Sequence, residues 1–79
     1  MINYHAELQN PTLYIHEGGS WLEGRIYNDT HTHGNHPFRD GVTVTTTAVM
    51  DEILNEGNTY MVTRNTTYKI VGTVREINL

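Results

Sequence analysis

The stretch Asp29–Gly41 gathers the side chains with the richest chemistry in this chain of 79 residues. His31, His33 and His36 lie in it, followed by Arg39. Three imidazoles can hold a zinc ion and leave one coordination position open. Because histidine titrates near neutral pH, the same loop could instead respond to pH or contact phosphate. The spacing is not specific for zinc, so we predict a polar loop with no resident metal or cofactor.

Aromatic side chains offer a second kind of chemistry, because flat rings can stack on a ligand. Trp21 is the only tryptophan. It falls on the opposite face of its predicted strand from Leu22 and Ile26, and aromatic residues at such positions often supply interface anchors or stacking platforms. If the two faces are inverted, Trp21 fills the core instead. For Phe38 in the polar loop, packing against the domain is the simplest interpretation.

Hydroxyl, amide and guanidinium groups complete the candidate binding set. The run Thr43–Thr47 presents four threonine hydroxyls, which can both donate and accept hydrogen bonds. Arg64 and Asn65 fall in a predicted hairpin turn, where an arginine beside free backbone N–H groups can clamp a phosphate or carboxylate. Both patterns also fit an ordinary polar strand or turn. The predicted ligand-binding residues are Trp21, Phe38, Arg39, Thr46, Thr47, Arg64 and Asn65.

Catalysis has little support in the sequence. The chain lacks cysteine, and its single serine, Ser20, has no nucleophile motif around it. Asp51, Glu52 and Glu56 are acidic neighbours, but a charged turn explains them more simply. Acid–base chemistry by histidine would depend on a geometry that the sequence does not reveal. We therefore predict a binding protein rather than an enzyme.

The charge of the chain argues against several classes of partner. The net charge is −4 with the histidines neutral. The basic residues are spread along the sequence, so no run of them can neutralise the phosphates of duplex nucleic acid. No stretch is long and apolar enough to span a membrane, and the first residues lack the parts of a signal peptide. We expect an intracellular, cytoplasmic protein.

Length and composition favour one small all-β domain over residues 1–79. Threonine and tyrosine favour strands and asparagine favours turns. Twelve threonines and eight asparagines, against two alanines and one lysine, are poor material for long helices. We expect five or six strands in an SH3-like or partly open barrel. Because disulfides are impossible and an open sheet has edges to cover, we also expect a homo-oligomer.

Turn residues and alternating patterns place the strands. Asn10-Pro11 marks a break after a short N-terminal segment. Val42–Leu54 begins as a clear strand, because consecutive β-branched residues are hard to place in a helix. The other strands form two hairpins, Thr12–Glu17 with Ser20–Asn28 around Gly18-Gly19, and Thr59–Thr63 with Thr67–Val71. The predicted core consists of Leu13, Ile15, Leu22, Ile26, Val42, Val44, Ala48, Met50, Ile53, Val62, Tyr68, Ile70 and Val74.

Short motifs run through the central and C-terminal parts of the chain. They are Asp40-Gly41 with Val44, Thr46, Thr47 and Val49, then Gly57, then Val62-Thr63 with Asn65-Thr66, Tyr68 and Ile70, and upstream Trp21, Gly24 and Ile26 with His36 and Phe38. In these motifs the chain resembles short β proteins that phages and prophages carry. The resemblance covers more than half of the sequence, and the N-terminal segment up to Gly19 has no counterpart in it.

This resemblance implies a role in an infected bacterial host, because some small phage proteins of this kind counter bacterial immunity. Some act as sponges, usually homo-oligomers, which sequester cyclic-nucleotide or adenine-nucleotide signals near subunit interfaces. Others, such as anti-CRISPR proteins, block a defence protein directly. The first expectation is therefore a nucleotide sponge in the host cytoplasm. In the alternative, Asp51, Glu52 and Glu56 form the patch that blocks a defence complex.

Overall fold

Strands dominate the part of the chain that the computed structural model describes, residues 2–30 and 37–79, and no helix occurs there. The seven strands are β1 (Ala6–His16), β2 (Gly19–Tyr27), β3 (Thr43–Thr45), β4 (Val49–Asn55), β5 (Asn58–Thr63), β6 (Thr67–Val71) and β7 (Arg75–Asn78). The prediction of an all-β chain is confirmed.

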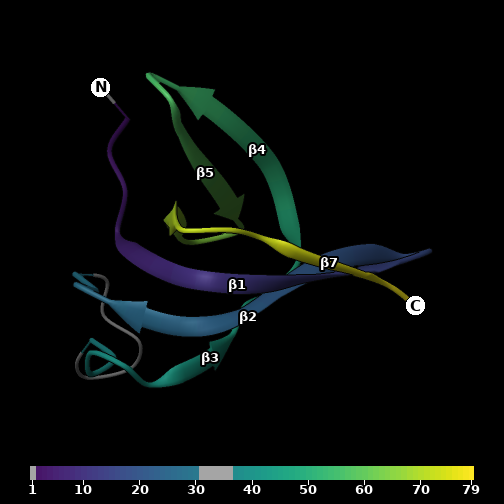
Figure 1. Ribbon diagram of the computed structural model, residues 1–79, viewed down its shortest axis with the longest axis horizontal. Helices are drawn as coiled ribbons and strands as arrows, with labels where there is room; N and C mark the ends of the chain where they lie inside the picture. Colours follow the sequence, from purple (N-terminus) through teal and green to yellow (C-terminus); the bar gives the residue numbers. More distant parts are fainter. Residues whose placement is uncertain (1, 31–36) are drawn as a thin grey trace.

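All seven strands belong to one bent sheet in the order β3-β2-β1-β6-β5-β4, and β7 pairs with the second half of β1 (Figure 1). β1 is antiparallel to β2 and parallel to β6 and β7. β4 and β5 rise on one side of β1, and β2 and β3 lie on the other. β3 and β4 remain at opposite edges, so the sheet is not closed into a barrel. We had predicted an SH3-like or partly open barrel of five or six strands; the described residues form seven strands instead.

The first strand is longer than predicted, because Asn10 and Pro11 form a β-bulge and not a break. The pairing of β1 with β2 shifts between Gln9 and Thr12, and Asn10 has a φ of 44°. A bulged residue is left out of the ladder, so the missing N–H of proline is tolerated there. Pro11 is fully buried, and a Cβ on Gly24 would lie only 3.1 Å from its Cα.

A second irregularity lets β6 and β7 follow the bend of β1. Gly72 lies between these two strands and has a φ of 85°, which glycine adopts without steric cost. Beside it, Asn10 Oδ1 accepts a hydrogen bond from the Thr73 N–H at 3.0 Å. A Cβ on Gly72 would collide with this oxygen. The two irregularities therefore fix each other.

The predicted strand Val42–Leu54 is divided in two at Thr46. The Thr46 N–H donates to the Leu22 carbonyl at 2.8 Å, and Thr46 Oγ1 accepts from the Leu22 N–H at 3.0 Å. The same hydroxyl donates to the Thr47 carbonyl at 2.8 Å. These bonds end β3 against β2, and the chain then crosses to the other edge of the sheet, where β4 begins. Threonine favours strands, but here the hydrogen bonds between the Thr46 side chain and the backbone interrupt the strand.

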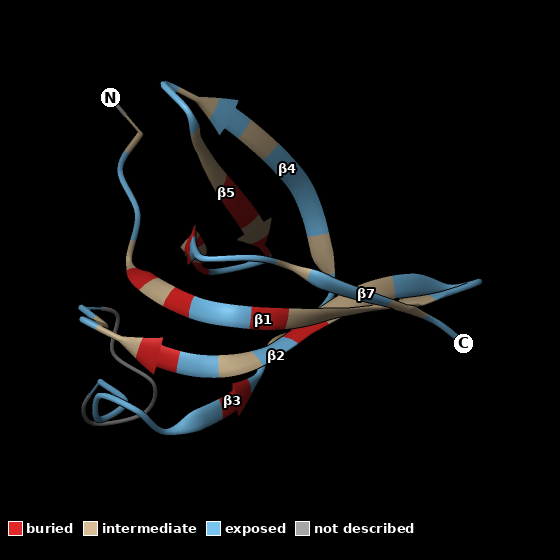
Figure 2. Ribbon diagram, viewed as in Figure 1, coloured by how far each residue is buried: buried red, intermediate tan, exposed pale blue. Residues whose placement is uncertain are grey.

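The hydrophobic core follows the central strands of the sheet (Figure 2). The buried cluster consists of Ala6, Leu8, Leu22, Ile26, Val44, Met61, Tyr68 and Ile70, with Leu13, Val49 and Val74 packed against it. Five of these buried residues were predicted. Ala6 and Leu8 were missed because the strand was expected to begin only after Asn10-Pro11.

Three residues of the predicted core are exposed. Val42 precedes β3, Ala48 lies between the two strands, and Met50 is the extra residue of a bulge in β4. Val42 lies before the first residue of β3, and the interruption at Thr46 together with the bulge at Met50 breaks the alternation that the prediction continued through Ala48 and Met50. A register change of this kind moves a whole hydrophobic set to the other face.

Candidate functional site

A groove of about 440 Å³ lies beside the turn that joins β1 and β2. The turn residues are Glu17 and Gly18, one position earlier than predicted. His16 Nδ1 supports the turn by accepting a hydrogen bond from the Gly18 N–H at 3.2 Å. The lining residues are His16, Gly18, Gly19, Ser20, Trp21, Thr45, Thr46 and Ala48. This volume lies within the range of small-molecule sites, roughly 300–1,000 Å³.

Trp21 forms one wall of the groove. Its ring stacks on Tyr14 of β1, with ring centroids 5.7 Å apart and planes inclined by 21°. Tyr14 is the cross-strand partner of Trp21, and β3 flanks β2 on its other side. The tyrosine therefore covers part of the indole, and Tyr14 itself does not line the groove that Trp21 borders. Trp21 is half-buried while Leu22 is fully buried, which confirms the predicted assignment of the two faces.

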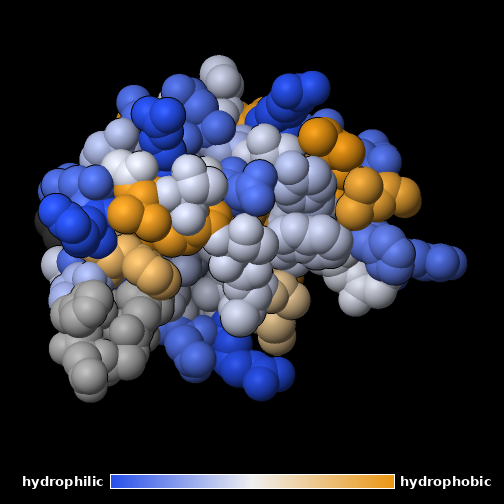
Figure 3. Space-filling view, turned by 90° about the horizontal axis from the view of Figure 1, so that it is seen from below, coloured by the Kyte–Doolittle hydropathy of each residue, from blue (hydrophilic) through white to orange (hydrophobic). Residues whose placement is uncertain are grey.

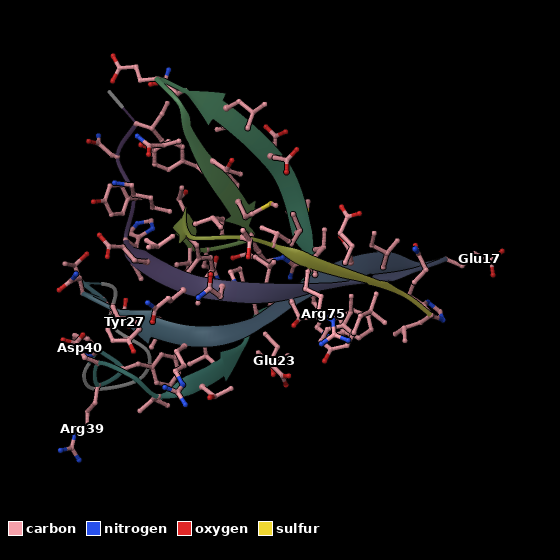
Figure 4. All side chains as sticks on the ribbon, in the orientation of Figure 1. Glu17, Glu23, Tyr27, Arg39, Asp40 and Arg75 are labelled. Carbon is pink, nitrogen blue, oxygen red and sulfur yellow. The ribbon has the colours of Figure 1, made fainter. Side chains whose placement is uncertain are left out.

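Glu23 lies beside the ring pair, and its carboxylate accepts hydrogen bonds from two hydroxyl groups. Tyr14 Oη donates to Glu23 Oε1 at 3.4 Å, and Thr45 Oγ1 donates to Glu23 Oε2 at 3.3 Å. The register places Glu23 in one cross-strand row with Thr12, Arg75 and Thr45. Figure 4 shows Glu23 and Arg75 on the same side of the sheet. The ring pair thus has a carboxylate close by and an arginine two strands from that carboxylate.

The two threonines predicted as ligand contacts differ in position. Thr46 lines the groove, but its hydroxyl already bonds to the Leu22 N–H and the Thr47 carbonyl. It therefore shapes the groove and has little capacity left for a ligand. Thr47 is exposed and does not line the groove.

Phe38 and Arg39 are held near the opposite end of β2. Asp40 Oδ1 accepts a hydrogen bond from the Asn28 N–H at 2.8 Å, and Asp29 Oδ2 accepts one from the Phe38 N–H at 2.9 Å. These aspartates fix the backbone on either side of the polar loop.

The length of β2 separates these residues from the groove. Six residues of extended strand lead from Trp21 to Tyr27, a distance of about 20 Å. Phe38 is 39% exposed, and Arg39 is exposed and projects away from the strands (Figure 4). Within one copy of the chain, the structure does not bring Phe38 or Arg39 to Trp21.

Arg64 and Asn65 are exposed in the turn between β5 and β6. Thr63 closes this turn, because its N–H and Oγ1 donate to the Thr66 carbonyl at 2.8 and 3.0 Å. The next residue, Thr67, donates its N–H to His5 Nδ1 at 2.9 Å. The turn is thereby attached near the start of β1, whereas Trp21 lies beside the far end of that strand.

Tyr68 is the buried titratable group next to this turn. Burial raises the pKa of Tyr68 above 10.0. A hydrogen bond with the Thr66 side chain lowers this pKa, and the negative charge of Asp29 raises it further. Tyr68 is therefore neutral near pH 7, and its ring belongs to the core.

Figure 3 shows one side of the molecule, on which apolar atoms form small separate groups among polar atoms. His31, His33 and His36 lie outside the described residues. Across residues 2–30 and 37–79, no three His, Cys, Asp or Glu side chains are grouped so that they could hold a metal ion. Nor does that part of the chain contain a helix long and apolar enough to cross a membrane.

The sequence did not identify Tyr14 as the partner of Trp21. Its pairing follows directly once the turn is placed at Glu17-Gly18, because His16 then faces Gly19 and Tyr14 faces Trp21. If the turn is placed at Gly18-Gly19, as predicted, Tyr14 no longer faces Trp21, so the ring pair is not recognised. The hairpin turn is therefore the signal that could have revealed it.

No family model, no curated protein and no solved structure matches the chain. The function must therefore be inferred from the groove itself.

Proposed function

We propose that the protein binds a small nucleotide-derived ligand without changing it chemically, and that the base of this ligand stacks on Trp21. Aromatic side chains bind bases by stacking, which contributes about 1–3 kcal/mol per base. The observation that carries the proposal is the half-buried indole, which stacks on Tyr14 and lines a groove of about 440 Å³.

The distribution of charge indicates which part of the ligand is recognised. Among residues 2–30 and 37–79, no lysine or arginine lines the groove; Glu23 stands beside the ring pair, and the net charge of the chain is −4. A phosphate would gain little electrostatic stabilisation there. The base therefore supplies most of the affinity, while the phosphate extends into solvent. A nucleoside is expected to bind within about tenfold of its nucleotide.

The biological role that we propose is sequestration of a nucleotide immune signal, in keeping with the resemblance to phage-borne counter-defence proteins. Sequestration needs affinity and sufficient protein, but no turnover. A groove lined by a ring, small residues and hydroxyl groups is compatible with such a task.

A thermal-shift screen tests the proposal. The panel contains adenosine, AMP, ADP-ribose, and cyclic di- and trinucleotides. A ligand at 100 times its dissociation constant should stabilise the fold by about 2.7 kcal/mol. Trp21→Ala should lose this stabilisation, and Phe38→Ala, at the other end of β2, should retain it. Absence of a shift with every compound would refute nucleotide binding.

Direct blocking of a defence protein is the second candidate function, and it uses a different surface. Asp51, Glu52 and Glu56 are exposed on and next to β4, an edge strand. Carboxylates presented in this way could occupy a basic nucleic-acid-binding surface. Co-purification with a host defence protein that Asp51→Lys/Glu52→Lys abolishes, with no response to nucleotides, would favour this function over the first.

A further inference from the structure

β4 is a long edge strand that exposes large apolar side chains. It has seven residues, compared with three in β3 at the other edge of the sheet. Met50 is 68% exposed and Leu54 is 75% exposed. Unpaired edges of this kind invite pairing with another strand, and proteins usually shorten, bend or charge them. A bulge at Met50 bends only the beginning of β4, and the pairing of Asp51–Asn55 stays regular. Asp51 and Glu52 put charge on this edge, so a partner strand must avoid placing carboxylates opposite them.

The turn after β4 determines which backbone groups face the open edge. Glu56 and Gly57 have φ values of 51° and 80°, as in a two-residue type I′ turn. Such a turn is flanked by a hydrogen-bonded pair, here Asn55 with Asn58. Hydrogen-bonded and non-bonded pairs alternate along an antiparallel ladder. The N–H and C=O groups of Glu52 and Leu54 are therefore the ones that point away from β5.

We propose that β4 pairs with β4 of a second copy of the chain, antiparallel and centred on Ile53. In this register Ile53 faces the partner's Ile53, and Glu52 faces the partner's Leu54. The outward N–H and C=O groups of Glu52 and Leu54 then form the hydrogen-bonded pairs on both sides of the two-fold axis. The two sheets join into one continuous sheet.

Charge selects this register over its neighbours. If one β4 strand is shifted along the other, the outward N–H and C=O groups of the two strands face each other again only after a shift of two residues. A register centred on Glu52 would place the two Glu52 carboxylates directly opposite each other, which is destabilising. A register centred on Leu54 would shorten the paired segment and run into the turns. With Ile53 at the centre, Asp51 faces the partner's Asn55, and no two carboxylates are directly opposed.

This interface leaves the groove open, because the groove is lined by Ala48, just before β4 begins, whereas the proposed pairing is centred on Ile53, further along the strand. It also leaves the Asp51 side chain on a face of the joined sheet. The proposed dimer is therefore independent of the proposed ligand, and the two can be tested separately.

Light scattering coupled to size exclusion, supported by native mass spectrometry, tests the register with matched variants. Two copies of a 9.0 kDa chain give a dimer of about 18 kDa. Leu54→Glu places a carboxylate opposite the partner's Glu52 twice per dimer and should weaken dimerisation about tenfold or more. Leu54→Lys is the matched control, because it faces the same Glu52 with opposite charge and should keep the dimer.

The double variant Leu54→Glu/Glu52→Lys restores opposite charges and should recover the dimer. Circular dichroism confirms that each variant is folded, which the exposure of Leu54 leads us to expect. A wild-type protein that stays monomeric at high concentration would overturn the proposal and leave the edge to a different partner. A dimer that tolerates Leu54→Glu as well as Leu54→Lys would also overturn it, because another surface would then hold the copies together.

Discussion

The two ends of β2 carry similar kinds of side chain but organise them differently. At the first end, Trp21 stacks on Tyr14, and Thr46 is bonded to the backbone beside it. At the second end, Phe38 and Arg39 are exposed, and aspartates hold the backbone there. At the first end an aromatic ring thus lines a groove, and at the second end an aromatic ring is partly exposed at the surface.

The difference follows from what flanks the strand. Trp21 is paired with Tyr14 of β1 on one side of β2. On the other side, β3 ends at Thr45, which is paired with Glu23, two residues after Trp21. Neighbouring side chains therefore restrict the ring. Beyond Tyr27 the chain leaves the sheet. Residues packed in this way are pre-organised, and they lose less conformational entropy on binding than exposed side chains do. Side-chain chemistry alone therefore does not identify the site.

The largest expected contrast between the two ends concerns stability. Leu22, next to Trp21, is fully buried, so Leu22→Ala should lower the free energy of unfolding by about 2–5 kcal/mol. Phe38→Ala at the other end should cost less than about 1 kcal/mol, because that ring is partly exposed. Urea denaturation measures both values. Equal losses would show that the second end is as well packed as the first.

The bend that β1 makes between the two ends can be tested next. Gly72→Ala should cost about 2–4 kcal/mol, because the new Cβ displaces the Asn10 side chain and the backbone has a positive φ. Gly57→Ala is the control, since Gly57 has a φ of 80° with open space around it, and should cost about 1 kcal/mol. Similar melting temperatures for the two variants would exclude a tight contact between Asn10 and Gly72.

A smaller effect is expected where Thr46 shapes the groove. Thr46→Val removes the acceptor of the Leu22 N–H and should cost about 1–2 kcal/mol. Thr47→Val changes an exposed side chain and should alter the free energy of unfolding by at most about 0.5 kcal/mol. Chemical denaturation of both variants decides whether Thr46 holds the groove together.

The smallest effect appears at alkaline pH, where the buried Tyr68 loses its proton. Because burial raises the pKa of Tyr68, the folded chain keeps this proton at a pH where the unfolded chain loses it. The stabilisation is complete below pH 10.0, the unfolded value, and is lost as the pH rises towards the raised folded value. Tyr68→Phe should therefore lose less stability than wild type as the pH rises above 10.0. Parallel pH profiles would contradict this assignment.

Local patterns predicted the all-β class, both hairpins and the face of Trp21. Alternation within a short segment contains this information, because neighbouring side chains point to opposite faces. The bulge at Asn10-Pro11 was not predictable in the same way. Proline is tolerated there because Gly24 and Gly72, distant in sequence, make room around the bend.

The candidate site was predicted only in part. Trp21 and Thr46 do border one groove. Arg39 and Arg64 were predicted to bind the same ligand, but whether they lie near Trp21 depends on where β2 ends and where the β5–β6 turn is attached. The first is set by strand length, and the second by the bond between Thr67 and His5, which no local pattern encodes.

Fluorescence of Trp21 tests the central claim most directly, because this is the only tryptophan in the chain. Adenosine and AMP are titrated separately into wild-type, Phe38→Ala and Arg39→Ala protein. Stacking in the groove should give saturable quenching to the same end point in all three, with the two ligands within about tenfold in affinity. Compounds that stabilise the fold without changing this fluorescence, or stabilisation that survives Trp21→Ala, would contradict the assignment of the ligand to the Trp21 groove.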